Sequence, residues 1–448
     1  MIGLASTAPA YSLAVTVGLL ADEAGGHAAG IMLLAVAPML LVALAYRELN
    51  AHEPDAGTTF AWVARAFGPR TGWLGGWAVV VSSLFVMASL AQVAAQYLFL
   101  LVGADGLADS RGAQLVAGLV WIGLLTWLCS RGITTTAATQ TALLLIELVL
   151  LLVFTVKALW EVVVVGHQGS TTPEASWLDP FGAGMSATWT GLLLAVFLYW
   201  GWDSSFSVNE ETAAPRRGPA IAALAAIGVL VVVLVGSTVA VIAWGGVERT
   251  AALGDEDVLA AFAQEVLGGQ GGNLLLLCVL SSAVAGTQTT IVPMVRTVLS
   301  MGAHGAMPAP LARVEKDSGS PALATWVIGA VSAALFVAFL MSSENALADS
   351  VEATALGICA YYGLTCAAVP AYFRGHLSGR RNIVFRLIVP IAGSAWMVAL
   401  LIGSVSSLLG GESKVFGIAT PVLFAAAALL AGLVLMATQR RGAYFTSR

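Results

Sequence analysis

Charged side chains are scarce in this sequence. Asp, Glu, Lys and Arg together make up 10% of the 448 residues, whereas hydrophobic residues make up 58% and the mean hydropathy is +0.89. A soluble globule of this length needs far more charge to cover its surface. The composition therefore excludes a soluble protein and predicts an integral membrane protein that lies in a lipid bilayer. The formal net charge of −5 says little about partners, although we expect no nucleic acid among them.

Cysteine is equally scarce, and the motifs of common enzymes are missing. Each of the four cysteines lies inside an apolar run without metal-ligand spacing: Cys129, Cys278, Cys359 and Cys366. We interpret them as small buried hydrophobes, and we expect neither disulfides nor a bound metal. The sequence has no phosphate-binding loop, no His-Glu-x-x-His and no nucleophile elbow. We therefore expect no enzymatic activity and no cofactor.

Long apolar runs are what the sequence has in abundance. A helix that crosses a bilayer needs about 20 apolar residues. Runs of this kind occupy residues 1–21, 30–46, 72–102, 114–129, 139–165, 187–208, 219–244, 272–299, 322–341, 352–373, 384–407 and 417–437. They predict an all-α membrane protein with about twelve transmembrane helices and no soluble domain.

The distribution of basic residues predicts the orientation. With a cytoplasmic N-terminus, three basic residues fall in outer loops: Arg111, Arg249 and Lys414. The inner loops and tail then hold Arg47, Arg65, Arg70, Arg131, Arg216, Arg217, Arg296, Arg313, Lys316, Arg374, Arg380, Arg381, Arg386, Arg440, Arg441 and Arg448. This excess indicates cytoplasmic N- and C-termini in the cytoplasmic membrane, because basic loops stay on the inner side.

The first apolar run contains helix-breaking residues. Gly3, Ser6, Thr7 and Pro9 stand where an ordinary spanning helix has leucine or valine. Proline removes a backbone donor and clashes with the preceding turn. Backbone freed at membrane depth persists only where it faces protein, water or a ligand. We predict a discontinuous helix that lines a binding site; a signal peptide is the alternative, although a basic n-region is missing.

A second interrupted span lies five helices later and runs in the opposite direction. Gly201, Asp203, Ser204 and Ser205 fall deep within residues 187–208, where a carboxylate is costly without a partner or a cavity. Two breaks at matching positions are typical of inverted five-helix repeats around a midplane site in secondary transporters. The alternative is that glycine and serine only allow close helix packing.

Two connections are long enough to fold locally. The inner connection at residues 48–70 has an amphipathic stretch with Phe60, Trp62, Val63 and Phe67, and we interpret its aromatic residues as membrane-interface anchors. In the outer connection, residues 255–267 have apolar positions at helical spacing: Val258, Leu259, Ala261, Phe262 and Val266. We expect a short surface-lying helix there, with an outer lid as the alternative.

Several short stretches match the motifs of one known family. They read Gly-Leu-Ala-Ser-Thr-Ala-Pro-Ala-Tyr-Ser-Leu at 3–13, Pro-Asp-Ala-Gly-Thr-Thr-Phe at 54–60, Phe-Leu-Tyr-Trp-Gly-Trp-Asp at 197–203, Glu-Glu at 210–211, a Pro-x-Arg-x-Pro-Ala-Ile run at 215–221 and Gly-Ala-Met-Pro at 305–308. The chain resembles the bacterial amino acid permease branch of the amino acid, polyamine and organocation (APC) transporters. The resemblance implies the leucine-transporter type fold, with repeats at 1–165 and 187–373 and two further helices within 384–437.

The sequence also departs from this family. Ala303 and His304 stand where Arg-Asp is usual before the loop glycine. The family's cytoplasmic tail and the first turns of helix one are missing, because Met1 lies only a few residues before the break. Either the true start is upstream or the inner gate is shortened.

The helix ends at the two breaks suggest a site for a zwitterion. Unpaired N–H groups at the start of the second half of helix one suit a carboxylate, and carbonyls near Tyr199 suit an ammonium group. Trp202 is placed to close over a substrate, although simple core packing is nearly as common for such an aromatic. We expect a small amino acid to contact Ser6, Thr7, Ala8, Pro9, Ala10, Tyr11, Tyr199, Gly201, Trp202 and Asp203. Selectivity candidates that the sequence does not rank are Ser82, Ser83, Ser281, Ser282, Tyr361 and Tyr362.

Glu147 is the candidate for proton coupling. It lies about two turns inside the fifth span, where an ionised carboxylate is costly unless it is paired. In the family, a Gln-x-x-x-x-x-x-Lys spacing often places a lysine at this position; here Gln140 matches and Glu147 replaces the lysine. The alternative is that Glu147 only binds the freed backbone of helix one, and Lys157 is a weaker candidate. Sodium is less favoured than the proton.

These observations predict a permease that works by proton symport or exchange. A transporter of amines, polyamines or ethanolamine is the closest alternative. A transport-dead sensor or a channel of the same fold is the second.

Overall fold

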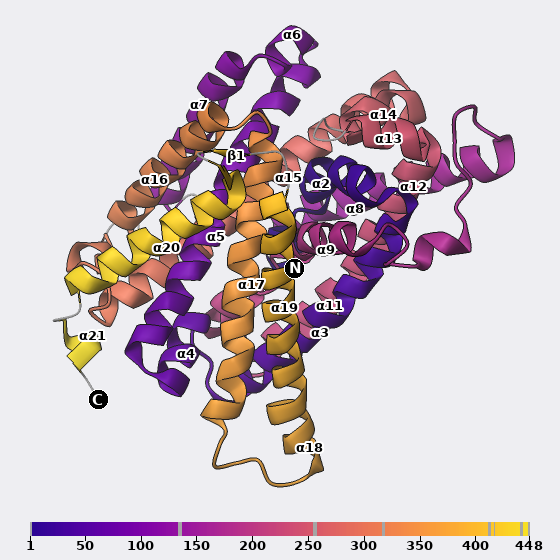
Figure 1. The fold of residues 1–448 in the computed structure, drawn as a ribbon. Helices are drawn as coiled ribbons and strands as arrows, with labels where there is room; N and C mark the ends of the chain where they lie inside the picture. The colour runs from indigo at the N-terminus through magenta and orange to yellow at the C-terminus, as the bar shows by residue number, and fades with distance from the viewer. Residues whose placement is uncertain are drawn as a thin grey trace.

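A computed structural model describes residues 2–132, 137–253, 258–315, 319–410, 414–415, 417–439 and 442–446. It is a bundle of long helices, and the N-terminus lies in the middle of the bundle in the view of Figure 1. Among the described residues, strands are limited to the antiparallel pair β1 (Lys414–Val415) and β2 (Ile418–Ala419). Lys316, Arg440, Arg441 and Arg448, which entered the orientation argument, lie outside the described residues.

The predicted spans correspond to helices of the structure. In chain order they are α1 (Ile2–Thr7) with α2 (Pro9–Ala24), α3 (Ala28–His52), α5 (Pro69–Leu101), α7 (Arg111–Ser130), α8 (Ala137–Trp160) extended by a π-helical turn (Glu161–Val165), α9 (Met185–Tyr199) with α10 (Ser204–Ser207), α11 (Gly218–Leu230) continued through a π-helical turn (Val231–Val235) into α12 (Gly236–Gly245), α15 (Gly269–Ala303), α16 (Ala322–Ser342), α17 (Ala346–Tyr372), α18 (Arg380–Ile383) continued through a π-helical turn (Val384–Ile388) into α19 (Val389–Gly410), and α20 (Thr420–Gln439).

Ten stretches of the described chain are long and apolar enough to cross a membrane. One of them, residues 2–52, holds the first two predicted spans, divided by a 3-10 turn at Gly25–His27. The predicted sixth span is interrupted at residues 200–203, which leaves α9 with only 15 residues. These two account for the difference from the predicted twelve. The all-α membrane fold with broken helices 1 and 6 is confirmed.

Short elements connect the spans. They are α4 (Thr59–Phe67), α6 (Asp105–Ala108), α13 (Val247–Leu253), α14 (Val258–Leu267), α21 (Ala443–Thr446) and 3-10 turns at Ala175–Leu178, Asn209–Glu211 and Ala309–Ala312. In α14, four of the five predicted apolar positions are buried, namely Val258, Leu259, Phe262 and Val266, whereas Ala261 is exposed. The helix packs on α15. Asp255, the predicted start of this helix, lies outside the described residues.

The interpretation of the α4 aromatics as membrane-interface anchors is wrong for most of them. Phe60, Trp62 and Val63 are buried, and α4 packs against α5 and α17. The indole of Trp62 donates a hydrogen bond to the Glu53 carbonyl at 3.0 Å. Only Phe67, which is 45% exposed, fits the interfacial role. The other side chains serve as core because the Pro54 turn folds α4 back onto the bundle.

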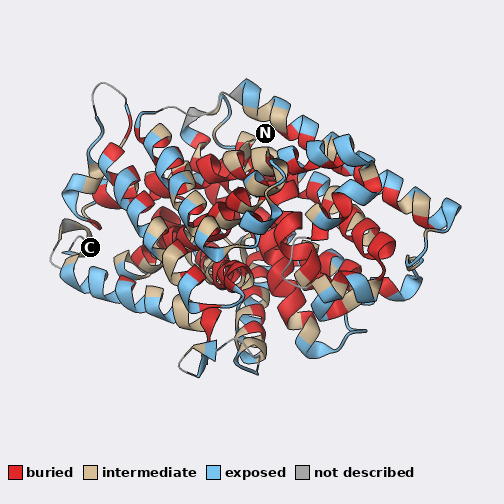
Figure 2. Ribbon diagram, turned by 90° about the horizontal axis from the view of Figure 1, so that it is seen from above, coloured by how far each residue is buried: buried red, intermediate tan, exposed pale blue. Residues whose placement is uncertain are grey.

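Burial is concentrated where the broken helices lie. Figure 2 shows buried residues in the middle of the bundle and exposed residues on the outer helices. On α8, Ile146, Val149 and Val153 are exposed, whereas Glu147 is 4% exposed. An outer face of large apolar side chains suits lipid, so α8 turns its one buried carboxylate away from the membrane and toward α2 and α15.

Candidate functional site

The break in the first helix lies where the sequence predicts it. α1 ends at Thr7, and α2 begins with Pro9 at its first helical position. Between them, Ala8 has φ 46° and ψ 66°, a left-handed conformation that costs an L-residue about 1 kcal/mol. Proline tolerates the first position of a helix because the N–H that it lacks would have no helical partner there. The chain therefore restarts as a new helix immediately after the break.

The second break lies directly against the first. α9 ends at Tyr199, and Gly201 adopts φ 115° before α10 begins at Ser204. A Cβ atom at Gly201 would lie 2.7 Å from the Ser6 carbonyl carbon, and one at Gly3 would lie 2.8 Å from the Trp202 carbonyl oxygen. Both positions require glycine, because a side chain would push the two broken segments apart.

The carboxylate of Glu147, a residue of α8, binds at the start of α2. Its Oε1 accepts a hydrogen bond from the Ala10 amide at 2.6 Å and another from the Ser282 hydroxyl at 2.9 Å. The Ser282 oxygen in turn lies 3.4 Å from the Tyr11 amide nitrogen, which donates to it. A carboxylate is stabilised here by the positive end of the α2 dipole. The backbone donors predicted to receive a substrate carboxylate thus hold a carboxylate of the protein itself.

The other ionisable side chain of α8, Lys157, does not reach the first break. Lys157, ten residues along α8, instead lies 3.6 Å from Glu161, and its ammonium donates to the Val266 carbonyl. Lys157 therefore belongs to the other end of the helix, and Glu147 remains the ionisable group of α8 that reaches the break.

Asp203 is linked to α17 across the second break. The Tyr361 hydroxyl donates to Asp203 Oδ2 at 2.8 Å, and the indole N–H of Trp200 donates to the Tyr361 oxygen. Tyr361 is one of the residues that the sequence did not rank. This chain of hydrogen bonds places Asp203, Tyr361 and Trp200 together beside Gly201.

Two small cavities adjoin the breaks. One of about 10 Å³ is lined by the predicted residues Ser6, Thr7, Ala8 and Tyr11, together with Ser12, Val86, Leu90, Phe197, Trp200, Gly286 and Thr290. The other, of about 30 Å³, is lined by Ser6, Thr58, Val79, Ser83, Trp200, Gly201, Asp203, Ser204, Ser207, Thr289, Thr290, Pro293 and Tyr361. The first is barely large enough for one water and the second for about two, so an amino acid needs side chains to move. Ser6, Trp200 and Thr290 line both cavities.

Trp202 lies elsewhere. It is fully buried, with ring centroids 5.4 Å from Tyr362, 5.6 Å from Tyr46 and 6.3 Å from Phe206. Its position is that of a core aromatic, and Trp200, two residues earlier, borders both cavities instead. Side-chain direction in a non-helical stretch follows no regular period, so the sequence could not distinguish the two tryptophans.

The remaining predicted residues either form hydrogen bonds within the protein or do not line the cavities. The Thr7 hydroxyl donates to the Gly3 carbonyl at 3.1 Å, and the Tyr11 hydroxyl shares a hydrogen bond with Ser89 at 2.6 Å. Tyr199 is fully buried, and neither it nor Pro9 nor Ala10 lines the two cavities. Sequence reasoning missed Trp200, Thr289 and Thr290; the position of Trp200 next to Gly201 was the available signal.

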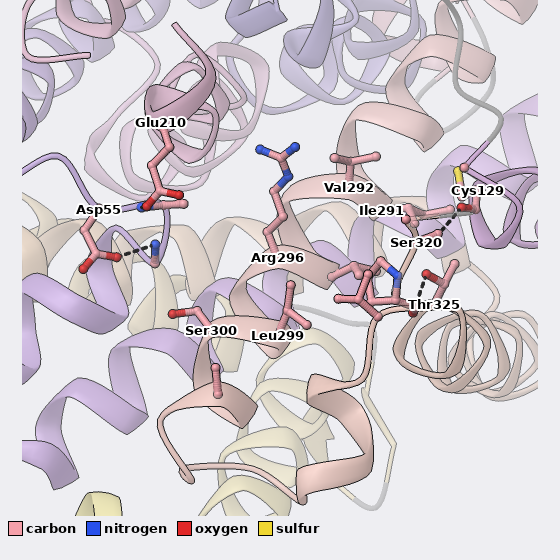
Figure 3. A pocket seen from close by; sticks show the side chains of 18 of the residues that line it. Asp55, Cys129, Glu210, Ile291, Val292, Arg296, Leu299, Ser300, Ser320 and Thr325 are labelled. Atoms are coloured by element: carbon pink, nitrogen blue, oxygen red, sulfur yellow. Dashed lines mark hydrogen bonds between the residues drawn. The ribbon is translucent and has the colours of Figure 1, made fainter. Parts of the chain in front are cut away.

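A larger cavity opens at the end of the bundle that carries the predicted inner loops. It has a volume of about 670 Å³. Figure 3 shows Arg296 projecting into it from α15, with Asp55 and Glu210 on one side and Ser320 and Thr325 on the other. The Arg296 guanidinium donates to the Ser207 carbonyl at 3.2 Å. Ser207 also lines the 30 Å³ cavity, so this arginine lies between the two spaces.

Comparisons with known proteins identify the family of this chain. A family model described as "Amino acid permease" matches residues 2–434. The chain is similar to the cationic amino acid transporter 3, mitochondrial, of Arabidopsis thaliana, with 26% identity over 358 residues that cover 77% of this chain and 57% of that protein. It is also similar to the branched-chain amino acid permease BcaP of Lactococcus lactis, with 24% identity over 70% of each chain.

A third relative has a different kind of substrate in its name. The low-affinity putrescine importer PlaP of Escherichia coli is 24% identical over 220 residues, which cover 48% of this chain and 46% of that protein. The identities of all three relatives are low, and their names cover two classes of small molecule.

Proposed function

Because the chain belongs to the amino acid permease family, we propose that it carries a small amino acid across the cytoplasmic membrane by alternating access, with a proton as the coupling ion. Members of this family are transporters and not enzymes. The termini would lie in the cytoplasm, following the excess of basic residues in the predicted inner loops. The observation that carries the proposal is the hydrogen bond from the Ala10 amide to Glu147 at 2.6 Å.

The start of α2 can bind only one carboxylate at a time. While Glu147 is ionised, it holds the Ala10 amide directly and engages Ser282, which receives the Tyr11 amide. A protonated carboxyl is a weaker acceptor because it has lost its charge. Protonation of Glu147 therefore releases the donors at the start of α2 to the carboxylate of an amino acid. A proton and an amino acid bind together in this scheme, which is the requirement for symport.

The opposite charge of the amino acid has partners at the same place. Both α1 and α9 end at the breaks, and the last carbonyls of a helix lack helical partners and carry partial negative charge. Asp203, beside Gly201, adds a carboxylate to this surface. An ammonium group near Ser6 and Asp203 and a carboxylate near Ala10 match the two ends of an α-amino acid.

The coupling has an electrical consequence. A proton that enters with a zwitterion moves one positive charge inward, which is worth about 2.3 kcal/mol per 100 mV of membrane potential. Exchange of one internal for one external amino acid moves no net charge. A pH gradient with the acidic side outside should consequently drive accumulation, whereas exchange should proceed without any gradient.

Uptake into liposomes tests the proposal. Purified protein in proteoliposomes should give saturable uptake of at least one labelled amino acid when the outside is acidic. A thermal-shift series with that amino acid, its amide and its decarboxylated amine should show stabilisation by the amino acid alone. Absence of uptake for all twenty amino acids, or equal stabilisation by the amine, would overturn the proposal.

An amine is the second candidate, and one observation favours it. The described site has two helix C-terminal ends and two carboxylates, Asp203 and Glu147, while the donors of α2 are already taken. If Glu147 never leaves Ala10, the charged and helix-end groups that remain at the site are acceptors, which suit a cation. The same thermal-shift series distinguishes the candidates, since an amine substrate would stabilise the protein without a carboxylate.

A further inference from the structure

The 670 Å³ cavity has the position of an exit from the site. Its walls come from the inner end of α15, the turn at residues 55–57, Glu210 and the loop at residues 319–321. These segments adjoin basic residues that predict the cytoplasmic side, among them Arg65 and Arg131. The cavity is far larger than the two at the breaks, so it holds an amino acid without rearrangement.

The two spaces adjoin different faces of the same stretch of α15. Thr289, Thr290 and Pro293 line the 30 Å³ cavity, whereas Ile291, Val292 and Arg296 line the large one. Neighbouring residues of an α-helix point in directions about 100° apart, so these interleaved positions face two sides of the helix. Arg296 is the charged residue of this stretch.

Arg296 links α15 to α10. Its guanidinium reaches from α15 to the Ser207 carbonyl at the end of α10, with an N–O distance of 3.2 Å. Ser207 is mostly buried and lines the 30 Å³ cavity, and Ser204 lines it one turn earlier. This hydrogen bond ties α10 to α15 at the boundary between the two spaces.

We propose that the contact between Arg296 and Ser207 is a gate that closes the passage from the broken helices to the large cavity, and that this cavity is the cytoplasmic vestibule. The inference rests on the transport function proposed above. The carboxylate of Glu210 lies across the cavity from the arginine (Figure 3). When the guanidinium leaves the Ser207 carbonyl, this carboxylate is an acceptor to which it can turn. Asp55 lies on the same side of the cavity but is already paired with Arg65 at 3.0 Å.

Cysteine accessibility tests the gate without any substrate. The background has Cys129, Cys278, Cys359 and Cys366 replaced by alanine. In it, the labelling rate of Ser204→Cys measures access to the site, and that of Ser300→Cys measures access to the vestibule. Inside-out vesicles are treated with a membrane-impermeant maleimide. Ser300→Cys should react in every background. Ser204→Cys should react at least about tenfold faster when Arg296→Gln is added. This corresponds to a loss of about 1.4 kcal/mol from the free energy that favours the closed gate.

Two further variants keep the test decisive. Arg296→Lys retains a cationic donor and should keep Ser204→Cys slow. Arg296→Met retains the length of the side chain without the donor, and should give the fast rate even if the glutamine variant fails to fold. Equal rates for Ser204→Cys with Arg296 and with Met or Gln would overturn the gate. Failure of Ser300→Cys to react from this side would overturn the vestibule. Neither outcome depends on uptake, so the transport proposal is tested separately.

Discussion

The Oε1 atom of Glu147 lies 2.6 Å from the amide nitrogen of Ala10, which joins the fifth span to the first residues after the break in helix one. The donor is one that an amino acid carboxylate would need, and the acceptor is a group that can take up a proton. The relationship converts two separate sequence features, a broken helix and a buried glutamate, into one site. The predictions below follow from it and from the packing of the two breaks.

Binding of the amino acid should depend on pH. If one proton binds with each substrate, the affinity should rise by up to about tenfold for each unit that the pH falls, because the two ligands are thermodynamically linked. Isothermal titration between pH 5 and pH 8 measures this slope. The slope should be absent in Glu147→Gln and retained in Glu161→Gln, a control on the π-helical extension of the same helix. A slope that survives in Glu147→Gln would contradict the role of this residue.

Gly201→Ala should destabilise the protein. Gly201 has φ 115°, and an added Cβ would lie 2.7 Å from the Ser6 carbonyl carbon. We expect a loss of about 1–3 kcal/mol from the strained backbone alone, visible as a lower melting temperature in detergent. Gly228→Ala in α11 is the matched control, because a Cβ there meets no atom within 4 Å and should be neutral or stabilising. Equal effects of the two substitutions would contradict the close approach of the breaks.

The two neighbouring tryptophans should behave differently. Trp202→Ala removes a fully buried ring from a cluster with Tyr46 and Tyr362 and should cost about 3–5 kcal/mol of stability. Trp200→Ala should cost less stability but weaken substrate affinity, because this residue lines both small cavities. Melting curves and binding measurements on both variants check the assignment. A reversed pattern would restore Trp202 as the residue that covers the substrate.

Asp203→Asn should weaken binding of amino acids and amines alike. The substitution removes the charge near an expected ammonium group, and a hydrogen bond to a charged group contributes about 1.5–3 kcal/mol, so the affinity should fall at least about tenfold. Tyr361→Phe, which removes the hydroxyl that donates to Asp203 at 2.8 Å, separates this effect from a structural one. An unchanged affinity with a lower melting temperature in Asp203→Asn would assign the carboxylate to holding the broken helix.

The sequence predicted the fold and the breaks because these depend on local chemistry. Pro9 cannot continue a helix, and Gly201 beside a carboxylate at membrane depth indicates unwinding, so both breaks could be placed within a few residues. The α4 aromatics were misjudged because an amphipathic stretch packs equally well on lipid and on protein. Here the Trp62 ring packs against Tyr46, and its indole N–H donates a hydrogen bond to the Glu53 carbonyl.

The partners within the site could not be predicted in the same way. Ser282 and Glu147 are 135 positions apart and meet only because α15 and α8 pack together. The gate residue Arg296 entered the sequence analysis only as one of many basic residues. Its contact with Ser207 depends on how α10 restarts after the second break, which no local pattern specifies.

The most direct test of the account is accumulation driven by an imposed pH gradient. Proteoliposomes with an acidic outside should accumulate the labelled amino acid above its external concentration with the wild-type protein. Glu147→Gln should abolish this accumulation and still exchange labelled for unlabelled substrate in counterflow. A Glu147→Gln protein that still accumulates the amino acid on the pH gradient would contradict the account.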